Sequence, residues 1–502
     1  MSTRLRGSYA LAVLIVLLGL CPDLVLSTSF LPLSTVLSGA LGASLAWLQV
    51  ANGLSNAAFA VGVVVAAQLA QRHRQRPLFL GYAATFMGGS VLAAAAWSTA
   101  PFLVGRVLQG GATGMMMISA LPPLITQFGV GRLALTAGIV DIGLFGATTL
   151  GPLVGGIAAG PWSWRALMWA IAALGALTLV TAYAGYPELD PVDRDVQLDG
   201  SALALTATAA VLVFLSTSWL SSTSWSSWRF WAPFVLGLGT LAALVVHQRR
   251  RPGALMPVGP LSTQLPVTGT LVAMVAGATF VTAVELVQLY LADVAGSSPS
   301  SAGALFWSMP VGLVPAAVLF GVLFTTRYLP YLVNLGLLAL VGGCAALLLL
   351  SASGTTTVVP WAAALLGFGA GATVAPGLFL AGLGVSSQLL GRAFALVQLL
   401  RLVATYSVGP VVLYLSQRQS APYDGVRIGI WVTLALSVGG LLASLVVPAV
   451  SGARPHTPDL EGWLERGERA LASPVTAVHL RPGTEDAEAH HLVPSVLRRR
   501  RR

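Results

Sequence analysis

The chain has 502 residues, of which 56% are hydrophobic and only 9% carry a formal charge. Its mean hydropathy is +0.82, whereas about a quarter of the residues in an ordinary soluble domain are charged. This composition excludes a water-soluble globular protein, because no such fold could bury so much apolar surface. The two cysteines, Cys21 and Cys344, lie in apolar stretches, so we expect neither a disulfide framework nor a metal cluster.

The first apolar segment follows Arg4 and Arg6 and resembles a signal peptide in that respect. Leu20, however, is too large for the small-residue position that precedes a cleavage site. The apolar run also continues to Val36, which makes it long enough to cross a bilayer. We therefore interpret this segment as the first membrane span.

Fourteen apolar runs are long enough to cross a membrane. A bilayer core of about 30 Å requires about 20 apolar residues in a helix. The predicted spans are 9–35, 45–70, 77–97, 102–125, 132–158, 165–186, 200–220, 229–248, 267–291, 301–325, 329–351, 357–384, 391–416 and 427–450. The sequence therefore predicts an all-helical, multi-pass membrane protein.

Arginine is unevenly distributed between the predicted loops. With the N-terminus inside, twelve arginines of the loops and the N-terminal segment, and nine more in the tail, lie on the cytoplasmic side. Only Arg165, Arg229, Arg418 and Arg427 lie on the outer side. Because cytoplasmic loops collect arginine, we predict that both termini are cytoplasmic. The expected location of the protein is the plasma membrane.

The fourth span carries a run of arginine, glutamine and small residues at positions 106–114. Arg106 and Gln109 are followed by Gly110 and Gly114. Glycines on one helix face allow a neighbouring backbone to approach closely. We therefore expect this span to pack tightly against another helix.

The fifth span carries the run Gly-Pro-Leu-Val-Gly-Gly at positions 151–156. Pro152 removes a backbone donor, while Gly151, Gly155 and Gly156 remove side-chain bulk. This helix is therefore expected to bend and to pack closely along one face.

These two runs resemble the R-x-x-Q-G and G-P-x-x-G-G signatures of the major facilitator superfamily, the second of which is an antiporter motif found mainly in exporters. Asp23 precedes Pro32 by nine residues, which is the spacing of the fourteen-helix drug:proton antiporter branch. Residues 162–165, Trp-Ser-Trp-Arg, are similar to the W-R-W segment of that branch. The resemblance implies a transporter without a cofactor, driven by a proton gradient.

The resemblance also implies two six-helix bundles with two inserted helices. The expected divisions are an N-terminal bundle at 1–186, an acidic cytoplasmic linker at 187–199, the inserted pair at 200–251 and a C-terminal bundle at 252–450. Mixed charge and prolines predict a disordered cytoplasmic tail at 451–502, interrupted by a short helix near 459–472 and ending in five arginines.

The loop between the second and third spans departs from the family pattern. The family has an aspartate where this chain has Gln71, next to Arg72 and before Arg76. In the family, that aspartate helps to latch the two halves of the molecule. The resemblance therefore implies a latch here that is weaker or is rebuilt from hydrogen bonds. A second departure is Thr28, which replaces the asparagine usual between Asp23 and Pro32.

Ionisable side chains within the spans are functional candidates, because a charge at the bilayer centre is costly. By helix rise, Asp23 and Arg106 lie at similar depths, about 21 Å and 24 Å from the inner face, so they could form a pair, either functional or purely structural. Asp141 lies near the midplane and is suited to carrying a proton. Glu285 could carry a proton or could be simply hydrated near the outer boundary.

Two further polar faces are expected to line a cavity, since exposure to lipid would be penalised. Arg401 shares one face with Gln398 and Thr405, while Asn52 and Asn56 form part of another on the second span. A fixed positive charge at mid-depth favours an anionic or zwitterionic substrate unless a carboxylate neutralises it.

The leading hypothesis is a proton-coupled exporter of small amphiphilic molecules or drugs, working by alternating access. One alternative is an exporter of an endogenous anionic metabolite or lipid, and another is a non-transporting membrane scaffold. An integral-membrane enzyme is disfavoured, because the one acidic cluster lacks histidine, metal-ligand spacing and a phosphate-binding loop. The expected partners are the lipid bilayer, protons and a small molecule; we expect a monomer and no nucleic-acid ligand.

Overall fold

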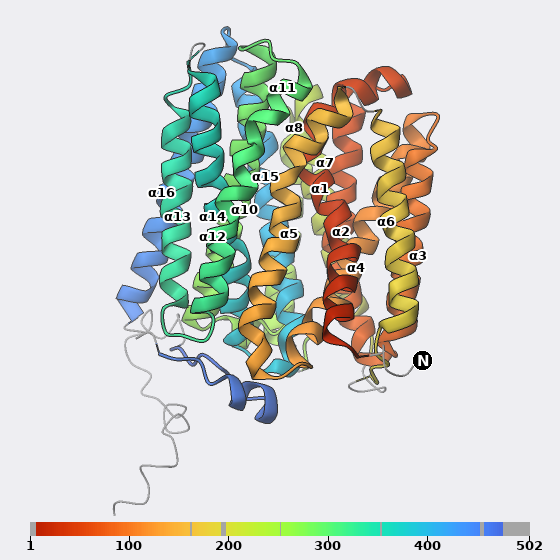
Figure 1. Cartoon of the computed structure of the whole chain (residues 1–502), viewed down its shortest axis with the longest axis vertical. Helices are drawn as coiled ribbons and strands as arrows, with labels where there is room; N and C mark the ends of the chain where they lie inside the picture. Colours follow the sequence, from red (N-terminus) through yellow and green to blue (C-terminus); the bar gives the residue numbers. More distant parts are fainter. Residues whose placement is uncertain are drawn as a thin grey trace, which may run out of the picture.

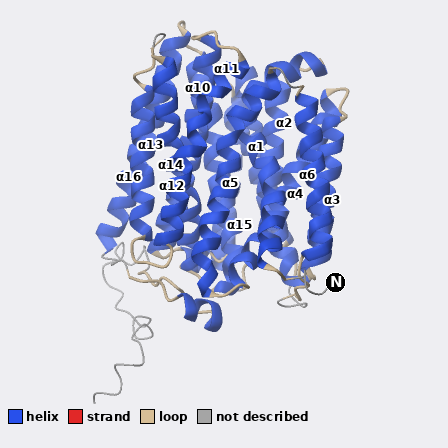
Figure 2. Ribbon diagram, in the orientation of Figure 1, coloured by secondary structure: helices blue, strands red, loops and turns tan. Residues whose placement is uncertain are grey.

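The computed structural model describes residues 7–160, 163–191, 197–251, 253–351, 354–451 and 456–474. All regular structure in these ranges is helical (Figure 2). The helices are α1 (Tyr9–Leu41), α2 (Leu45–Arg72), α3 (Gln75–Ala94), α4 (Thr99–Thr126), α5 (Val130–Ala159), α6 (Trp164–Gly185), α7 (Gly200–Ser218), α8 (Trp228–Arg250), α9 (Val258–Leu261), α10 (Gln264–Asp293), α11 (Pro299–Ala304), α12 (Ser308–Leu323), α13 (Leu329–Leu347), α14 (Thr355–Leu383), α15 (Leu390–Gln417) and α16 (Pro422–Ser451).

Thirteen helical stretches in the described ranges are long and apolar enough to cross a membrane, with α11 and α12 forming one stretch from Pro299 to Leu323. Helix α4 has 28 residues and is also long enough, but it is not among these thirteen stretches. The predicted all-helical fold is confirmed. The first span, expected to end at 35, continues to Leu41, and the cytoplasmic placement of the termini stays a prediction.

The long helices stand side by side in two groups (Figure 1). Helices α1 to α6 pack on one another, as do α10 and α12 to α16. The two groups meet along α5, which packs on α11 and α12, and along α2 and α4, which pack on α15. We call these groups the N-terminal and C-terminal bundles, and the side where α1 begins the terminal face. The opposite side is the distal face.

Helices α7 and α8 form a hairpin outside both bundles. Helix α7 packs on α2 of one bundle and on α15 of the other, whereas α8 packs mainly on α7. The backbone N–H of Trp225, between the two helices, donates to the hydroxyl of Tyr414 on α15 at 3.0 Å. The hairpin therefore covers the line along which the bundles meet on the α2–α15 side.

Glycines bring α2 and α4 into backbone contact. A Cβ atom at Gly110 would overlap the carbonyl of Ser55, and one at Gly114 would overlap the carbonyl of Phe59. The hydroxyl of Ser55 also donates to the carbonyl of Arg106 at 2.8 Å. The small residues of the fourth span thus have the packing role that the sequence predicted.

The glycine-proline run of α5 contacts both bundles. Gly151 and Gly155 face α1, where an added Cβ at Gly155 would lie 2.8 Å from the carbonyl of Ser29. Gly156 faces the opposite way, and a Cβ there would lie 2.9 Å from the Cα of Gly303 in α11. One short run therefore determines how closely α5 approaches helices on either side.

Part of the tail expected to be disordered is folded against the C-terminal bundle. Trp463 is fully buried, and its indole N–H donates to the carbonyl of Val385 beyond the end of α14 at 2.9 Å. The carbonyl of Pro474 accepts from the N–H of Gln264, at the start of α10, at 3.0 Å. Residues 456–474 are therefore held against the bundle in two ways. The apolar side chain of Trp463 is buried, and backbone groups near the helix ends form hydrogen bonds with this segment.

The expected short helix in this segment is reduced to one π-helical turn, Gly462–Arg466. Residues 452–455 and 475–502, including the five final arginines, lie outside the described residues. So do residues 192–196 of the acidic linker and Trp162 of the Trp-Ser-Trp-Arg segment.

Asp199 organises the terminal-face end of the α7–α8 hairpin. Its carboxylate accepts from the N–H of Ala202 at 3.1 Å, from Gln248 at 2.9 Å and from Arg251 at 2.6 Å. Burial alone would raise the pKa of Asp199, but hydrogen bonds from Ser201, Gln248 and Ala202, together with the Arg251 charge, hold it below its ordinary value near 3.8.

We expect Asp199→Asn to destabilise the hairpin at neutral pH, by on the order of 1 kcal/mol. Because the pKa of Asp199 is lowered on folding, its ionised form stabilises the fold above pH 3.8, and this contribution is lost as the pH falls through the folded-state value. Melting temperatures of wild type and variant in detergent should differ by a constant amount from pH 8 to pH 5 and converge below pH 4. A difference that persists unchanged at lower pH would show that the carboxylate charge is not responsible.

Candidate functional site

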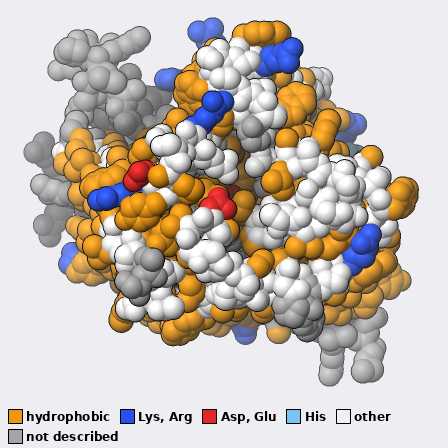
Figure 3. Space-filling view, turned by 90° about the horizontal axis from the view of Figure 1, so that it is seen from above, with side chains coloured by type: hydrophobic (Ala, Val, Ile, Leu, Met, Phe, Trp, Pro, Cys, Tyr) orange, Lys and Arg blue, Asp and Glu red, His pale blue; other side chains and the backbone are white. Residues whose placement is uncertain are grey.

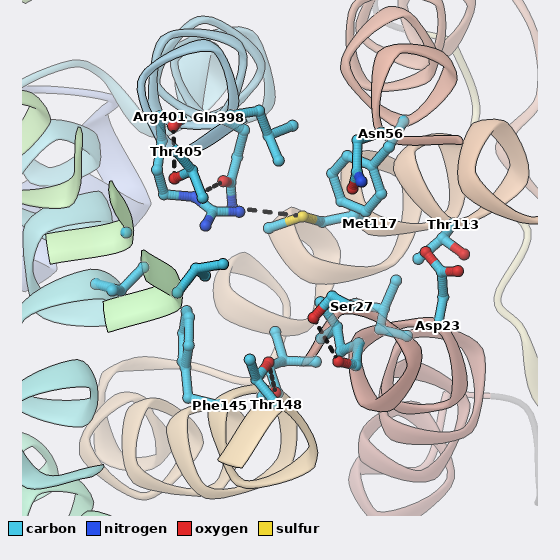
Figure 4. A pocket seen from close by; sticks show the side chains of 18 of the residues that line it. Asp23, Ser27, Asn56, Thr113, Met117, Phe145, Thr148, Gln398, Arg401 and Thr405 are labelled. Atoms are coloured by element: carbon cyan, nitrogen blue, oxygen red, sulfur yellow. Dashed lines mark hydrogen bonds between the residues drawn. The ribbon is translucent and has the colours of Figure 1, made fainter. Parts of the chain in front are cut away.

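A cavity of about 70 Å³ lies between the two bundles near the middle of the molecule. The N-terminal bundle contributes Asp23, Asn56 and Met117, and the C-terminal bundle contributes Gln398 and Arg401. Figure 4 shows that Arg401 and Asp23 lie on opposite sides of this space, on helices of different bundles. We call it the inner cavity.

Two further cavities continue from the inner cavity to the distal face. The middle cavity, of about 90 Å³, shares Thr405 and Tyr406 with the inner cavity. The outer cavity, of about 270 Å³, shares Phe30 and Gln417 with the middle one and extends to Asp293 at the end of α10. The distal face is hollowed near its middle (Figure 3). The three cavities thus form a series that reaches this face.

The bundles touch one another on the terminal side of the inner cavity. The amide of Gln398 on α15 lies 3.5 Å from the sulfur of Met117 on α4. Nearer the terminal face, the same two helices approach each other again. A Cβ at Gly391 of α15 would lie 3.5 Å from Pro122 of α4. These contacts separate the inner cavity from the terminal face, whereas the series of cavities extends from this cavity toward the distal face.

Asp23 and Arg106 form a buried ion pair within the N-terminal bundle. Their side chains approach to 3.1 Å, and the two residues are 8% and 2% exposed. The same Arg106 nitrogen donates to Gln109 at 2.8 Å, and Gln109 donates to Ser90 at 2.9 Å. The sequence argument from depth brought these charges together, and Gln109 is a buried partner of Arg106 rather than a residue of the cavity.

Arg401 reaches the inner cavity without a carboxylate beside it. Its Nε donates to Gln398 at 2.6 Å, and no described Asp or Glu lies within ion-pair distance. Asp23, the acid across the cavity, is already paired with Arg106. The inner cavity therefore presents an uncompensated positive charge.

The middle cavity contains an acidic side chain. It is lined by Glu285 of α10, by Asn52 of α2 and by Phe214 of α7. Among the residues that the structure describes, no cation lies beside Glu285. Asn52 lines this cavity and Asn56 the inner one, so the polar face of α2 is divided between them.

Asp141 is not among the residues that line these cavities. Its carboxylate is fully buried where α5 meets the C-terminal bundle, and neither oxygen has a hydrogen-bond partner. One oxygen would lie 3.3 Å from a Cβ at Gly371 of α14. An ionised carboxylate without a partner is very costly in such a place, so this packing requires the neutral acid.

The loop between α2 and α3 is tied to the acidic linker. Arg76 donates to Glu188 at 3.2 Å, and Arg74 lies 3.6 Å from Asp190. Gln71 donates to the carbonyl of Ala67 within its own helix, while Arg72, at the end of α2, is exposed. These described contacts stay within the N-terminal half, so the latch between halves that the resemblance implied is not rebuilt through them.

Tyr406 is the main cavity residue that the sequence did not single out. It lines both the inner and the middle cavity, and its ring lies 5.5 Å from that of Phe214 on α7, centroid to centroid. No sequence signal marked it, because residues five apart, as Tyr406 is from Arg401, do not share a helix face and an aromatic residue in an apolar helix does not stand out.

Comparison with known proteins identifies the class. The model of the Major Facilitator Superfamily matches residues 15–410, and the chain belongs to this family. The family and the relatives are transporters rather than enzymes. In the described residues, no three His, Cys, Asp or Glu side chains gather as metal ligands would.

Several relatives are similar over much of the chain. An uncharacterized MFS-type transporter, YubD of Bacillus subtilis, is 25% identical over 74% of this chain and 73% of its own length. The Tetracenomycin C resistance and export protein of Streptomyces glaucescens is 26% identical over 57% and 53%, respectively. Multidrug resistance protein 3 of Bacillus subtilis is 24% identical over 62% and 60%.

Solved structures agree on the fold alone. The human organic anion transporter MFSD10 (TETRAN) has a TM-score of 0.58 at 17% identity, covering 88% of this chain and 100% of that one. A POT family transporter in complex with 5-aminolevulinic acid has a TM-score of 0.65 at 12% identity, covering 88% and 96%.

We expect the Asp23–Arg106 pair to behave as a buried ion pair. Asp23→Asn and Arg106→Gln should each lower the free energy of unfolding by about 3 kcal/mol, because each leaves one buried charge uncompensated. The double variant should recover most of that loss. Thermal unfolding of the four proteins in detergent measures this coupling.

Arg74→Gln provides a matched control, because its pair with Asp190 is solvent-exposed and such pairs contribute at most about 1 kcal/mol. Additive losses in the Asp23→Asn/Arg106→Gln protein would contradict the pairing.

Proposed function

We propose that this transporter is a proton-coupled exporter of small amphiphilic molecules that works by alternating access. The observation that supports this proposal is the series of cavities between the two bundles, which extends toward the distal face and is separated from the terminal face by bundle contacts. A central site between two bundles, open to one side at a time, is the arrangement that alternating access requires.

The inter-bundle contacts suit rocking of the two halves. On α5, a Cβ at Gly138 would lie 3.2 Å from the carbonyl of Ala317, and on α12 a Cβ at Gly321 would lie 3.0 Å from the carbonyl of Ala134. Such flat contacts lack interlocking side chains, so the helices can separate without large changes in packing. Opening the terminal face would break these contacts and expose the inner cavity there.

Asp141 is the proposed proton carrier. While α5 packs on α14, its carboxylate has no partner and must be neutral. Separation of the bundles would admit water to the same oxygens and allow the proton to leave. Protonation and bundle closure are thereby coupled through one residue, and Glu285 in the middle cavity is a second candidate carrier.

Export follows if the terminal face is cytoplasmic, as the arginine distribution predicts. The names of two relatives, the tetracenomycin C export protein and the multidrug resistance protein, support export of amphiphilic compounds. The proposed location is the plasma membrane, with the protein acting as a monomer and with protons and a small molecule as its partners.

An anionic substrate is a second candidate within the same mechanism. The uncompensated Arg401 favours it, because an anion that enters the inner cavity would neutralise the charge, whereas a simple cation would be repelled. This is the feature that distinguishes the exporter of an anionic compound from a typical exporter of cationic drugs.

We expect inverted membrane vesicles that contain the protein to accumulate a fluorescent amphiphile when their interior is acidified, and a protonophore to abolish this uptake. Asp141→Asn should make uptake insensitive to the pH gradient, because the neutral amide cannot exchange a proton. Asp424→Asn, which alters an exposed acid at the start of α16, should retain coupling. The absence of substrate-dependent proton flux with the wild-type protein would favour the non-transporting scaffold.

The same vesicles separate the two substrate classes. With fluorescein as the anionic probe and ethidium as the cationic one, we expect fluorescein uptake to exceed ethidium uptake and to fall at least tenfold in Arg401→Gln. If ethidium competes with transport and fluorescein does not, then Arg401 is not the substrate contact.

A further inference from the structure

Two charged residues face glycines in a reciprocal pattern between α10 and α15. Arg401 of α15 lies against Gly277 of α10, where a Cβ would be 3.3 Å from its Cγ and 3.6 Å from its Nη1. Glu285 of α10 lies against Gly409 of α15, where a Cβ would be 3.3 Å from its Oε2. Each helix thus supplies one charge and one space for the charge of the other.

The pattern separates the two charges by a defined distance. Gly277 and Glu285 are eight residues apart on α10, and Arg401 and Gly409 are eight residues apart on α15. Since both helices advance in the same direction, the charges lie about two helical turns, or roughly 12 Å, apart along the membrane normal. The glycine contacts also keep both side chains between the helices instead of in lipid.

The two charges do not neutralise each other. Among the described residues, neither has an ion-pair partner, and each lines a different cavity, Arg401 the inner and Glu285 the middle one. The two cavities meet at Tyr406 and Thr405. An elongated molecule that passes Tyr406 would therefore contact a positive charge at one end and a negative charge at the other.

The surroundings of Glu285 suit a protonated amine. Aromatic rings of Phe214, Tyr406 and Tyr414 line the same cavity, and aromatic faces attract organic cations. Thr217 of α7 donates its hydroxyl proton to a backbone carbonyl of its own helix, so only its lone pairs are available to a ligand. The middle cavity thus presents a carboxyl group, a hydroxyl acceptor and aromatic rings beside the amide side chains that also line it.

The surroundings of Arg401 suit a carboxylate or another anion. Its Nε is used by Gln398, which leaves the two terminal nitrogens of the guanidinium for a ligand. A guanidinium binds a carboxylate through a pair of parallel hydrogen bonds. Asp23 across the cavity cannot repel such an anion strongly, because Arg106 neutralises it.

We propose that the inner and middle cavities form one bipolar site, which binds an elongated zwitterion with its anionic end at Arg401 and its protonated amine at Glu285. This proposal rests on the proposed transport function and specifies the substrate class. It also assigns a function to the inserted hairpin, because Phe214 of α7 belongs to the wall around the amine and packs on Tyr406.

The test is binding of 8-aminooctanoate to the purified full-length protein in detergent, measured by isothermal titration calorimetry. Octanoate and octylamine are the probes with one charge, and 4-aminobutanoate is the zwitterion that is too short to span both charges. We expect 8-aminooctanoate to bind at least tenfold more tightly than each of the other three, because hydrogen bonds to buried charges are strong.

Variants of the two charged residues show which of them binds the carboxylate of 8-aminooctanoate and which binds its amine. Arg401→Gln should weaken 8-aminooctanoate binding to the level of octylamine, and Glu285→Gln should weaken it to the level of octanoate. Gly409→Ala, which crowds the Glu285 carboxylate, should reduce binding of 8-aminooctanoate and octylamine while leaving octanoate binding unchanged.

Arg327→Gln and Asp424→Asn, which alter exposed charges outside the cavities, are the controls and should bind all four probes as the wild type does. Thermal unfolding verifies that each variant is folded.

Two outcomes would overturn the proposal: octanoate binding as tightly as 8-aminooctanoate, or Glu285→Gln weakening octanoate and 8-aminooctanoate equally. Neither depends on transport, since binding is measured without a membrane. If the binding pattern holds but vesicles show no proton-linked uptake, the transport proposal fails while the bipolar site stands.

Discussion

A charged side chain is far more costly in hydrocarbon than between helices, and this constraint determines where every membrane-buried charge of this protein lies. Asp23 and Arg106 neutralise each other inside the N-terminal bundle. Arg401 and Glu285 face internal cavities, and Asp141 is enclosed where the bundles meet. The polar interior of the molecule is therefore concentrated along the line between the bundles, which is where a substrate and a proton can both act.

Small residues make that interior possible. Glycines on α4 and α5 bring neighbouring backbones into contact, which stabilises each bundle without interlocking side chains. The same residue type provides space for charges, since Gly277, Gly371 and Gly409 lie opposite Arg401, Asp141 and Glu285, respectively. Replacing any of these three glycines by a larger residue would displace an ionisable side chain. The glycines of the C-terminal bundle are thus part of the candidate site, although no motif in the sequence marks them.

The folded part of the tail shows where sequence reasoning reaches its limit. Residues 451–502 have the composition of a disordered segment, yet residues 456–474 pack beneath the C-terminal bundle. The decisive features are a single buried tryptophan, Trp463, and backbone groups at the start of α10 and beyond the end of α14 that find their hydrogen-bond partners in the tail. Composition averages over such local contacts. Asp141 illustrates the same limit, because its depth was evident from the sequence but its lack of any partner was not.

The sequence by itself determined the all-helical membrane fold, the approximate limits of the helices, the tight packing of the fourth and fifth spans and the pairing of Asp23 with Arg106. These follow from hydropathy, from residue size and from a helix rise of 1.5 Å per residue, all of which are local properties. Only the tertiary structure decided that Asp141 lies outside the cavities, that Arg401 and Glu285 occupy adjoining ones and that Tyr406 lies between them. These relations depend on how helices from distant parts of the chain are rotated against one another, and no single helix contains that information.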